Sequence, residues 1–279
     1  MRFERISEPT AYEPTAPSAH AALPSDPLAF KRPQAGRQSQ AERRRDAGRR
    51  ALTGRDLAAL RWIGEQYTVR VDLAGVLLSR LSPEPVGLLS RRTVRQRVDR
   101  WEQAGWIARH RLLGHTWIVA TAAGLRHAGL DHLEPWAPAA VRLAHHHAVA
   151  LVRLAREPEP GGAGWVCERE LWRRRGKATW HLADGALPVE VPTLWRERGI
   201  GEAFELVEVE LHQKARRRVV AAFKTLPPST RLVTYYTVPE LHDALSAQLG
   251  SVVRELGGSV PVRVELLPQI PGVMGEVAA

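Results

Sequence analysis

The stretch SRRTVRQRVDRWEQAGWIARHRLLGHTWIVAT, residues 90–121, decides the fold of the first half of the chain. Ser90 has the side chain of an N-cap, and the helix that starts there is predicted to end at Gly105. Apolar residues recur on one face of this helix, as the inner stripe of an amphipathic helix requires: Val94, Val98 and Trp101. Two runs of β-forming residues then flank Leu113-Gly114-His115, which predicts a two-stranded hairpin.

Two further helices precede this stretch, and one follows it. Thr53 opens a Thr-x-x-Asp cap, and apolar residues follow it at helical spacing: Leu57, Leu60, Ile63 and Tyr67. We expect a second helix over 72–81 and a last one over 121–130. Three helices followed by a hairpin is the order of a winged helix-turn-helix, with 90–105 as its recognition helix and the hairpin as its wing. This domain is expected over residues 51–130.

The second half alternates helix-like and strand-like segments. After a proline-bearing linker over 131–140, the patterns predict a helix over 141–156, strand-like segments at 164–172, 179–187 and 204–212, a helix over 214–226, a strand at 231–238, a helix over 239–256 and a strand at 261–267. This order is that of a compact α/β domain, which we place at 141–279. The chain is therefore predicted to be a two-domain α/β (α+β) protein.

Positive charge is concentrated in the first 130 residues. The formal net charge is +10, and residues 131–279 balance 18 basic against 18 acidic side chains, whereas residues 51–130 hold 12 against 6 and residues 1–50 hold 10 against 6. Residues 1–50 are predicted to be a disordered basic arm, because they combine prolines with a basic end and no apolar period. The asymmetry indicates a nucleic-acid-binding front end joined to a part with a different task.

Composition excludes several classes of protein. With 279 residues, 44% of them apolar, the chain has enough material for about two domains with their own cores. Cys167 is the only cysteine, so no intrachain disulfide and no cysteine-rich zinc site can form. No apolar run approaches the about 20 residues of a membrane helix, and the start MRFERISEPT lacks the apolar core of a signal peptide. We expect a soluble, cytoplasmic protein with no membrane partner.

Seven side chains are predicted to contact double-stranded DNA. Five come from the outer face of the helix over 90–105 and two from the wing: Arg91, Arg92, Arg95, Gln96, Arg100, Arg109 and Arg111. Arg92, Arg95 and Gln96 are placed for base edges, whereas Arg100 is better placed for phosphate. The alternative is a charged, solvated helix face.

A homodimer is also an open alternative, because a winged helix often binds two half-sites as a dimer. The amphipathic helix over 239–256 is one candidate for the dimer surface, and burial of this helix against its own sheet is the other interpretation. Burial against the sheet is the commoner fate of such a helix, and nothing in the sequence fixes the dimer surface.

The segment ELVEVELHQK, which ends at Lys214, places carboxylates along one side of a strand. Alternation sends its apolar side chains to one face and Glu208, Glu210 and His212 to the other. Lys214 has the same parity if the strand continues, and a hairpin would bring Asp184, in HLADG, beside the glutamates. Carboxylates from neighbouring strands can hold Mg²⁺ or Mn²⁺, and a lysine can stabilise the charge of a reacting phosphate. Asp184, Glu208, Glu210 and Lys214 are therefore candidate catalytic residues, and the three acids are candidate metal ligands.

These residues carry a resemblance to known families. Asp184, then Glu208-Val-Glu210, then Lys214 looks like a variant of the PD-(D/E)XK nuclease pattern, and the order of elements over 141–267 is similar to that fold. A winged helix followed by CERELW, HLADG and VEVELHQK resembles the replication-relaxation family of actinobacterial plasmids and other mobile elements, over about residues 51–267. The resemblance implies a DNA-handling protein of plasmid replication or mobility, with Asp184 and Glu208 as metal ligands.

The sequence departs from the nuclease pattern at the lysine. The pattern has a lysine two residues after the glutamate, where this chain has Glu210, and then His212. Three interpretations stay open: the lysine has moved to Lys214, His212 replaces it, or the site is inactive. Glu168 and Glu170 in CERELW could supply a further carboxylate. The non-functional interpretation of the acidic strand is a solvent-exposed face paired with the arginines at 216–218.

Three functions are therefore weighed. The first is a DNA-binding protein of a plasmid or mobile element, with a second domain that nicks or cleaves DNA with Mg²⁺ or Mn²⁺. The second is a non-enzymatic winged-helix regulator or replication accessory factor, whose α/β domain serves dimerisation or partner docking. The third is a packaging protein that coats DNA with its basic arm. Convergence of Asp184, Glu208 and Glu210 would favour the first over the second.

Overall fold

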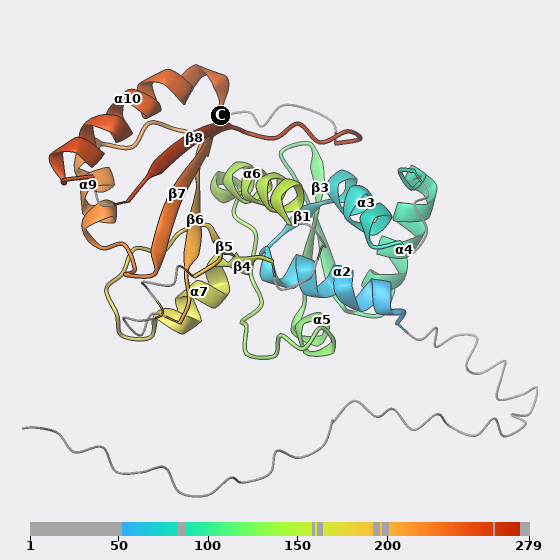
Figure 1. Ribbon diagram of the computed structural model, residues 1–279. Coiled ribbons are helices and arrows are strands. Elements are labelled where there is room, and N and C mark those ends of the chain that lie inside the picture. The colour runs from blue at the N-terminus through green and yellow to red at the C-terminus, as the bar shows by residue number, and fades with distance from the viewer. Residues whose placement is uncertain are drawn as a thin grey trace, which may run out of the picture. The chain divides into compact units, whose positions relative to one another are not determined.

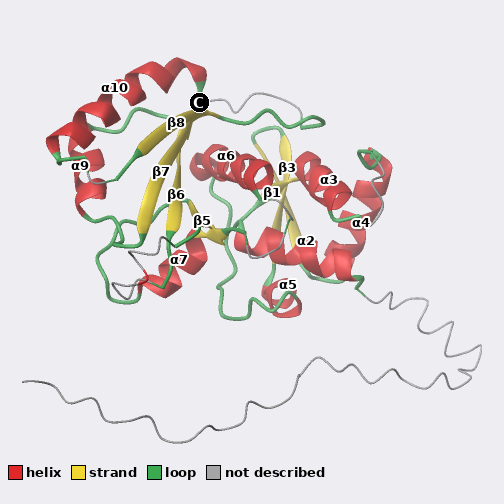
Figure 2. Ribbon diagram, viewed as in Figure 1, coloured by secondary structure: helices red, strands yellow, loops and turns green. Residues whose placement is uncertain are grey.

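The computed structural model describes residues 52–82, 87–157, 164–191, 201–258 and 260–273, together with residues 160 and 196. The basic arm predicted at 1–50 lies outside these residues. The described chain is a mixed α and β structure with two sheets, as predicted at the level of fold class (Figures 1 and 2).

Short helices surround a small sheet in the first half. In chain order the elements are α2 (Gly54–Glu65), β1 (Val69–Arg70), α3 (Val71–Arg80), α4 (Arg91–Gln103), β2 (Ile107–Leu112), β3 (His115–Ala120) and α5 (Ala122–His127). The sheet is antiparallel, in the order β1-β3-β2. Leu113 and Gly114 join β2 to β3 with φ of 52° and 74°. Two consecutive positive φ values suit the tight turns that match the twist of a hairpin.

Three caps start these helices where the sequence predicts them. Thr53 and Asp56 form a complete capping box on α2, in which each side chain bonds the backbone N–H of the other residue. Ser90 accepts from the Thr93 N–H, and Thr121 accepts from the Gly124 N–H. The predicted inner stripe of α4 is buried, which confirms the amphipathic pattern of this helix. Trp117 of β3 is buried as well.

The second half is built on a five-stranded sheet. Its elements are α6 (Ala140–Arg156), β4 (Val166–Cys167), α7 (Glu168–Arg175), β5 (Gly185–Pro188), β6 (Phe204–Glu210), α9 (Arg216–Lys224), β7 (Thr230–Thr237), α10 (Pro239–Glu255) and β8 (Val262–Leu266). The strand order is β4-β5-β6-β7-β8. β5 is antiparallel to both of its neighbours, whereas β6, β7 and β8 are parallel.

Helices cover both faces of the larger sheet (Figure 1). On one face, Val207 and Val209 of β6 pack with Val149 and Val152 of α6. On the other face, the apolar residues of β6 and β7 pack with those of α9 and α10: Leu206, Val233, Tyr235, Val219, Leu245, Leu249 and Val252. The apolar side of α10 is therefore used against its own sheet, which is the simpler of the two roles considered for it.

Three sequence predictions in this half are wrong in detail. CERELW is strand only at Cys167, because Glu168 begins α7, where Glu170 forms ion pairs with Arg173 and Arg174 one turn later. β5 starts at Gly185, so most of TWHLADGAL is loop. β6 ends at Glu210 rather than at residue 212, so the strand does not reach Lys214. In CERELW the Glu, Arg and Leu residues favour a helix, and in the other two segments β-forming residues extend past the paired part of the strand.

The one cysteine of the chain lies in the interior. Cys167 is buried and free, as a small apolar residue. Residues 51–279 pack as one compact unit that contains both sheets. Across the part of the chain that the structure describes, no helix has the length and apolar character needed to cross a membrane.

Candidate functional site

A basic face is exposed on α4. All five residues predicted for this face are exposed, at its start and along its outer side: Arg91, Arg92, Arg95, Gln96 and Arg100. Arg97 is the exception among the arginines of α4, since it is buried and donates a 2.5 Å bond to Asp56 of α2. The helix therefore uses Arg97 for packing and presents its other basic groups to solvent.

The two arginines predicted for the wing differ. Arg109 on β2 forms ion pairs with Asp99 and Glu102 of α4, and its hydrogen bond to Glu102 raises the pKa of the guanidinium. Arg111, two residues further along the hairpin, is exposed. Arg109 thus holds the hairpin to α4, and Arg111 is the better placed of the two for a partner.

An acidic cluster forms where β5 meets β6. Gly185 is the partner of Val207 in the antiparallel register, so Asp184 lies across from Glu208. One oxygen of Asp184 accepts from the Val209 N–H at 2.7 Å, and the other lies 2.9 Å from Nε2 of His145 on α6. The hairpin pairing predicted for Asp184 is correct, although its carboxylate turns toward α6.

Lys214 joins the two glutamates of β6. Its Nζ lies 2.7 Å from Oε2 of Glu210 and 3.6 Å from Oε2 of Glu208. The other oxygen of Glu208 lies 2.6 Å from Nε2 of His181. The lysine reaches the acids through the turn after β6, whereas His212 is exposed. Of the two basic groups considered for the missing lysine, Lys214 is the one at the acids.

The acidic strand is not solvent-exposed, as the non-functional interpretation requires it to be. Glu208 is 3% exposed and Glu210 is 7% exposed, and their partners are His181 and Lys214 rather than the arginines at 216–218. Burial of carboxylates is costly unless they are paired. A buried, paired set of acids is a more unusual arrangement than a solvated strand, and it marks this end of the sheet as a candidate functional site.

Burial and neighbouring charges shift the pKa values in the cluster. Burial raises the pKa of Glu210, and the charges of Glu208 and Asp184 add to that rise against the opposing effect of Lys214. Burial also raises the pKa of Asp184, but its bonds with His145 and Val209 outweigh this and leave it below its usual value. Burial lowers the pKa of Lys214, and the two glutamates more than compensate, so the ammonium is retained.

The sequence names Glu168 as a source of a further carboxylate, whereas it predicts no site role for His145 or His181. Glu168, at the start of α7, has its pKa raised by burial and then by the charge of Asp184. His145 and His181 bond the two acids described above, and for each the carboxylate outweighs burial and raises the pKa of the imidazole. His181 is the first residue of HLADG, so it lies within a motif that the sequence analysis singles out, whereas no local pattern marks His145.

The side chains of the cluster are of the type that binds a divalent cation, but they are not arranged as a metal site. Carboxylate oxygens are the ligands that Mg²⁺ and Mn²⁺ prefer. However, no group of three or more His, Cys, Asp or Glu side chains within the described ranges is disposed to hold a metal ion. Asp184 faces His145 while Glu208 faces Lys214 and His181. The two glutamates converge on the ammonium of Lys214, whereas Asp184 turns to His145, so the three acids do not converge on one point, which favours the non-enzymatic alternative.

Comparison of the chain with protein-family models, curated proteins and solved structures found no match.

Proposed function

We propose that this protein binds double-stranded DNA through α4 and nicks or cleaves DNA at the cluster of Asp184, Glu208, Glu210 and Lys214. The resemblance to the replication-relaxation family suggests plasmid replication or mobility as the setting. DNA binding is proposed for the first half of the chain, and phosphodiester cleavage with Mg²⁺ or Mn²⁺ for the second.

The support for DNA binding is the exposed basic face of α4. Arg92, Arg95 and Gln96 lie on one exposed side of the helix, and Arg100 follows one turn later. Helix, helix, helix and hairpin is also the element order of a winged helix, which places its third helix in the major groove. Arginine side chains suit this position, because the guanidinium forms paired hydrogen bonds with guanine and with phosphate.

Cleavage rests on one observation: among the described residues, two buried and two half-buried carboxylates gather beside the ammonium of Lys214. Glu168, Asp184, Glu208 and Glu210 influence one another electrostatically, and Lys214 is the cation that acts on the last three. Buried like charges repel strongly at low dielectric. A divalent cation would relieve this repulsion, which is a reason for the cluster to bind one.

The chain's own residues would share the chemistry as follows. A bound Mg²⁺ would stabilise charge on the reacting phosphate and lower the pKa of a bound water. The ammonium of Lys214 adds positive charge beside Glu208 and Glu210, where it can stabilise a phosphate oxygen. His145 and the Val209 N–H hold Asp184 in one orientation.

A supercoiled-plasmid assay with Mg²⁺ or Mn²⁺ tests the proposal. Asp184→Asn and Glu208→Gln keep the shape of each side chain and remove its charge, so both should abolish nicking while DNA binding by α4 persists. Glu265→Gln is the matched control, because Glu265 is an exposed acid on β8 of the same sheet. Equal nicking by all four proteins would contradict the assignment of the site.

A non-enzymatic role is the second candidate, and one observation favours it. Both oxygens of Asp184 and both oxygens of Glu208 already lie against nitrogen partners of the protein. A site that is neutralised in this way could serve only to hold the sheet and its helices together. In that case neither wild type nor any variant nicks DNA, Mn²⁺ titration gives no heat, and the two acidic variants lose stability instead.

A further inference from the structure

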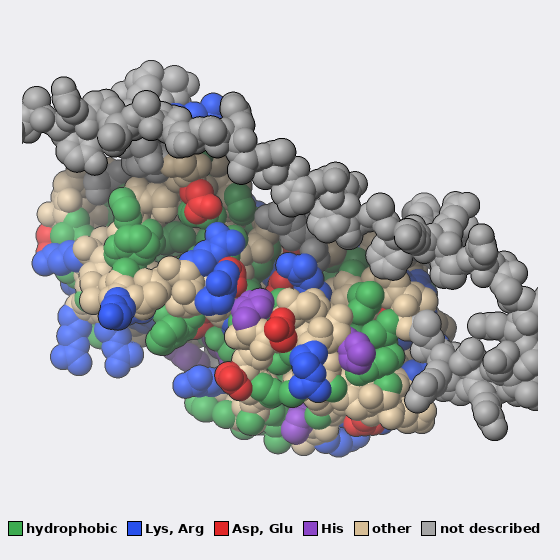
Figure 3. All heavy atoms as spheres, turned by 90° about the horizontal axis from the view of Figure 1, so that it is seen from below, with side chains coloured by type: hydrophobic (Ala, Val, Ile, Leu, Met, Phe, Trp, Pro, Cys, Tyr) green, Lys and Arg blue, Asp and Glu red, His purple; other side chains and the backbone are tan. Residues whose placement is uncertain are grey.

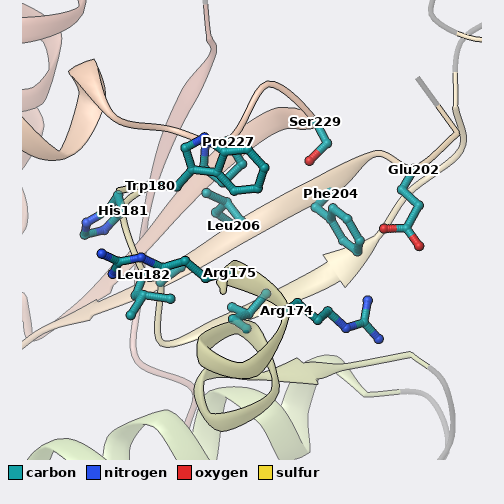
Figure 4. A pocket seen from close by; sticks show the side chains of 12 residues that line it. Arg174, Arg175, Trp180, His181, Leu182, Glu202, Phe204, Leu206, Pro227 and Ser229 are labelled. Atoms are coloured by element: carbon teal, nitrogen blue, oxygen red, sulfur yellow. The ribbon is translucent and has the colours of Figure 1, made fainter. Parts of the chain in front are cut away.

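A pocket of about 120 Å³ opens beside the acidic cluster. It lies between α7, the loop that leads to β5, the start of β6 and residues 227–229. Figure 4 shows Trp180 and Pro227 along one side and α7, with Arg174 and Arg175, along the other, while Leu206 and Phe204 of β6 lie between them. The pocket is therefore aromatic and apolar inside, with two guanidinium groups and the carboxylate of Glu202 at its border.

The geometry points to one unpaired nucleobase of a DNA strand as the occupant of this pocket, and we propose it as a base-binding site. The inference rests on the proposed DNA processing and adds that the DNA substrate is bound with one base unpaired. Trp180 lines the pocket and is 43% exposed, so its indole is accessible to a ligand. A cavity of 150 Å³ in another protein takes up one benzene ring, so the volume here suits a single flat ring.

Stacking is the interaction that such a pocket offers. An indole presents a flat face on which any base can stack, and this contact is the usual basis of single-strand recognition. A base inside a duplex has both faces covered by its neighbours, so the pocket accepts only an unpaired or extruded base. The arginines of α7 add positive charge for the phosphates on either side of that base.

The pocket is also connected to the acids. His181 lines the pocket, and its Nε2 lies 2.6 Å from Oε1 of Glu208. A base held against Trp180 therefore lies one side chain away from the carboxylates. Apolar side chains bordered by Lys and Arg also lie at the left of the face seen from below (Figure 3). This combination of apolar and basic surface suits a nucleic-acid strand better than an acidic peptide, which would gain little from the aromatic interior.

Binding of the full chain to an oligonucleotide of about 12 nucleotides tests the inference. The strand carries a fluorescent pyrimidine analogue that is quenched when it stacks, and its affinity is followed by anisotropy. Trp180→Ala should weaken single-strand binding about tenfold and remove the quenching. Trp172→Ala is the control, because Trp172 is equally an exposed tryptophan of this region but does not line the pocket. Both variants should keep the melting temperature and the duplex affinity of wild type.

Two results would overturn the inference. The first is single-strand affinity and quenching in Trp180→Ala that equal those of wild type. The second is displacement of the strand by a deoxynucleoside monophosphate at the same nucleotide concentration, which would make the pocket a site for free nucleotides. Plasmid nicking is measured on the same proteins. A chain that quenches the analogue but never nicks keeps the base-binding site and loses the proposed cleavage, whereas nicking without Trp180-dependent quenching does the reverse.

Discussion

The indole Nε1 of Trp62 in α2 donates a 2.7 Å hydrogen bond to Oε2 of Glu157, which follows α6 and lies 95 positions later in the sequence. Both side chains are buried. The contact joins the half that carries the small sheet to the half that carries the large one. A buried carboxylate needs such partners, since it has no water to solvate it.

Arg153 completes this connection and gives the first prediction. Its guanidinium is fully buried, bonds Glu157 and Glu65, and lies over the ring of Trp62 at 4.7 Å. Arg153→Met leaves two acids without their shared partner and should lower the free energy of unfolding by about 3–5 kcal/mol. Urea unfolding followed by tryptophan fluorescence measures this loss.

Arg61→Met is the matched control for that prediction. Arg61 pairs with the same Glu65, but its own side chain is exposed, one turn earlier on α2. Exposed pairs of this kind contribute about 0.5 kcal/mol. Equal losses in the two variants would mean that the buried network does not stabilise the junction.

The second prediction concerns the exposed face of α4. Arg92→Ala and Arg95→Ala should each weaken binding to a preferred duplex by about 1–3 kcal/mol, with unchanged melting temperature. Contact with six phosphates would give a slope of about −5 in a plot of log affinity against log salt concentration. Arg126→Ala, an exposed arginine of α5, removes the same charge elsewhere and should leave affinity unchanged. Normal melting with unchanged affinity in both α4 variants would refute the assignment.

The third prediction separates the cation site from simple charge. Lys214→Met leaves Glu208 and Glu210 without their shared ammonium and should tighten Mn²⁺ binding on the order of tenfold, while nicking falls. Lys224→Met, at the exposed end of α9, makes the same change in net charge and should have no effect on Mn²⁺. Titration calorimetry compares them. Identical Mn²⁺ isotherms for both variants would place any cation away from these glutamates.

The fourth prediction is a loss of stability in acid that depends on His147. This imidazole is buried in a T-shaped contact with Trp117, and neither ring nitrogen has a hydrogen-bond partner among the described residues. Burial, and then the charge of Arg70, lower its pKa to about 4, and His115 adds to this while Asp72 opposes it. The unfolded chain takes up a proton near pH 6.5, where the folded chain does not.

The contribution of His147 to the free energy of unfolding is therefore fully present above about pH 6.5. It falls by about 3 kcal/mol as the pH drops toward about 4. His147→Phe keeps a ring against Trp117 and should flatten the decline of melting temperature over that range. His132→Phe, at an exposed position, should leave the decline as it is in wild type. The same steep decline in His147→Phe would show that other groups cause the acid sensitivity.

Much of the local structure could be predicted from the sequence, because it depends on near neighbours. The cap at Thr53 requires only Asp56 three residues later, and the turn at Leu113-Gly114 requires only two residues with positive φ. The same Asp56 shows where this reasoning ends. Its carboxylate also accepts from Arg97 and Trp101 of α4, and no local pattern announces those partners.

The sequence by itself determined the helices other than α7, the hairpin, the alternation of β6 and the side on which Glu208 and Glu210 lie, since side-chain periodicity follows from backbone geometry. Only the tertiary structure decided that Asp184 turns toward His145, that Lys214 returns to the glutamates after the strand has ended, and that Arg153 binds acids from both halves. These contacts join residues from separate elements, so they depend on how helices pack on the sheet, and packing is a property of the whole chain rather than of any segment.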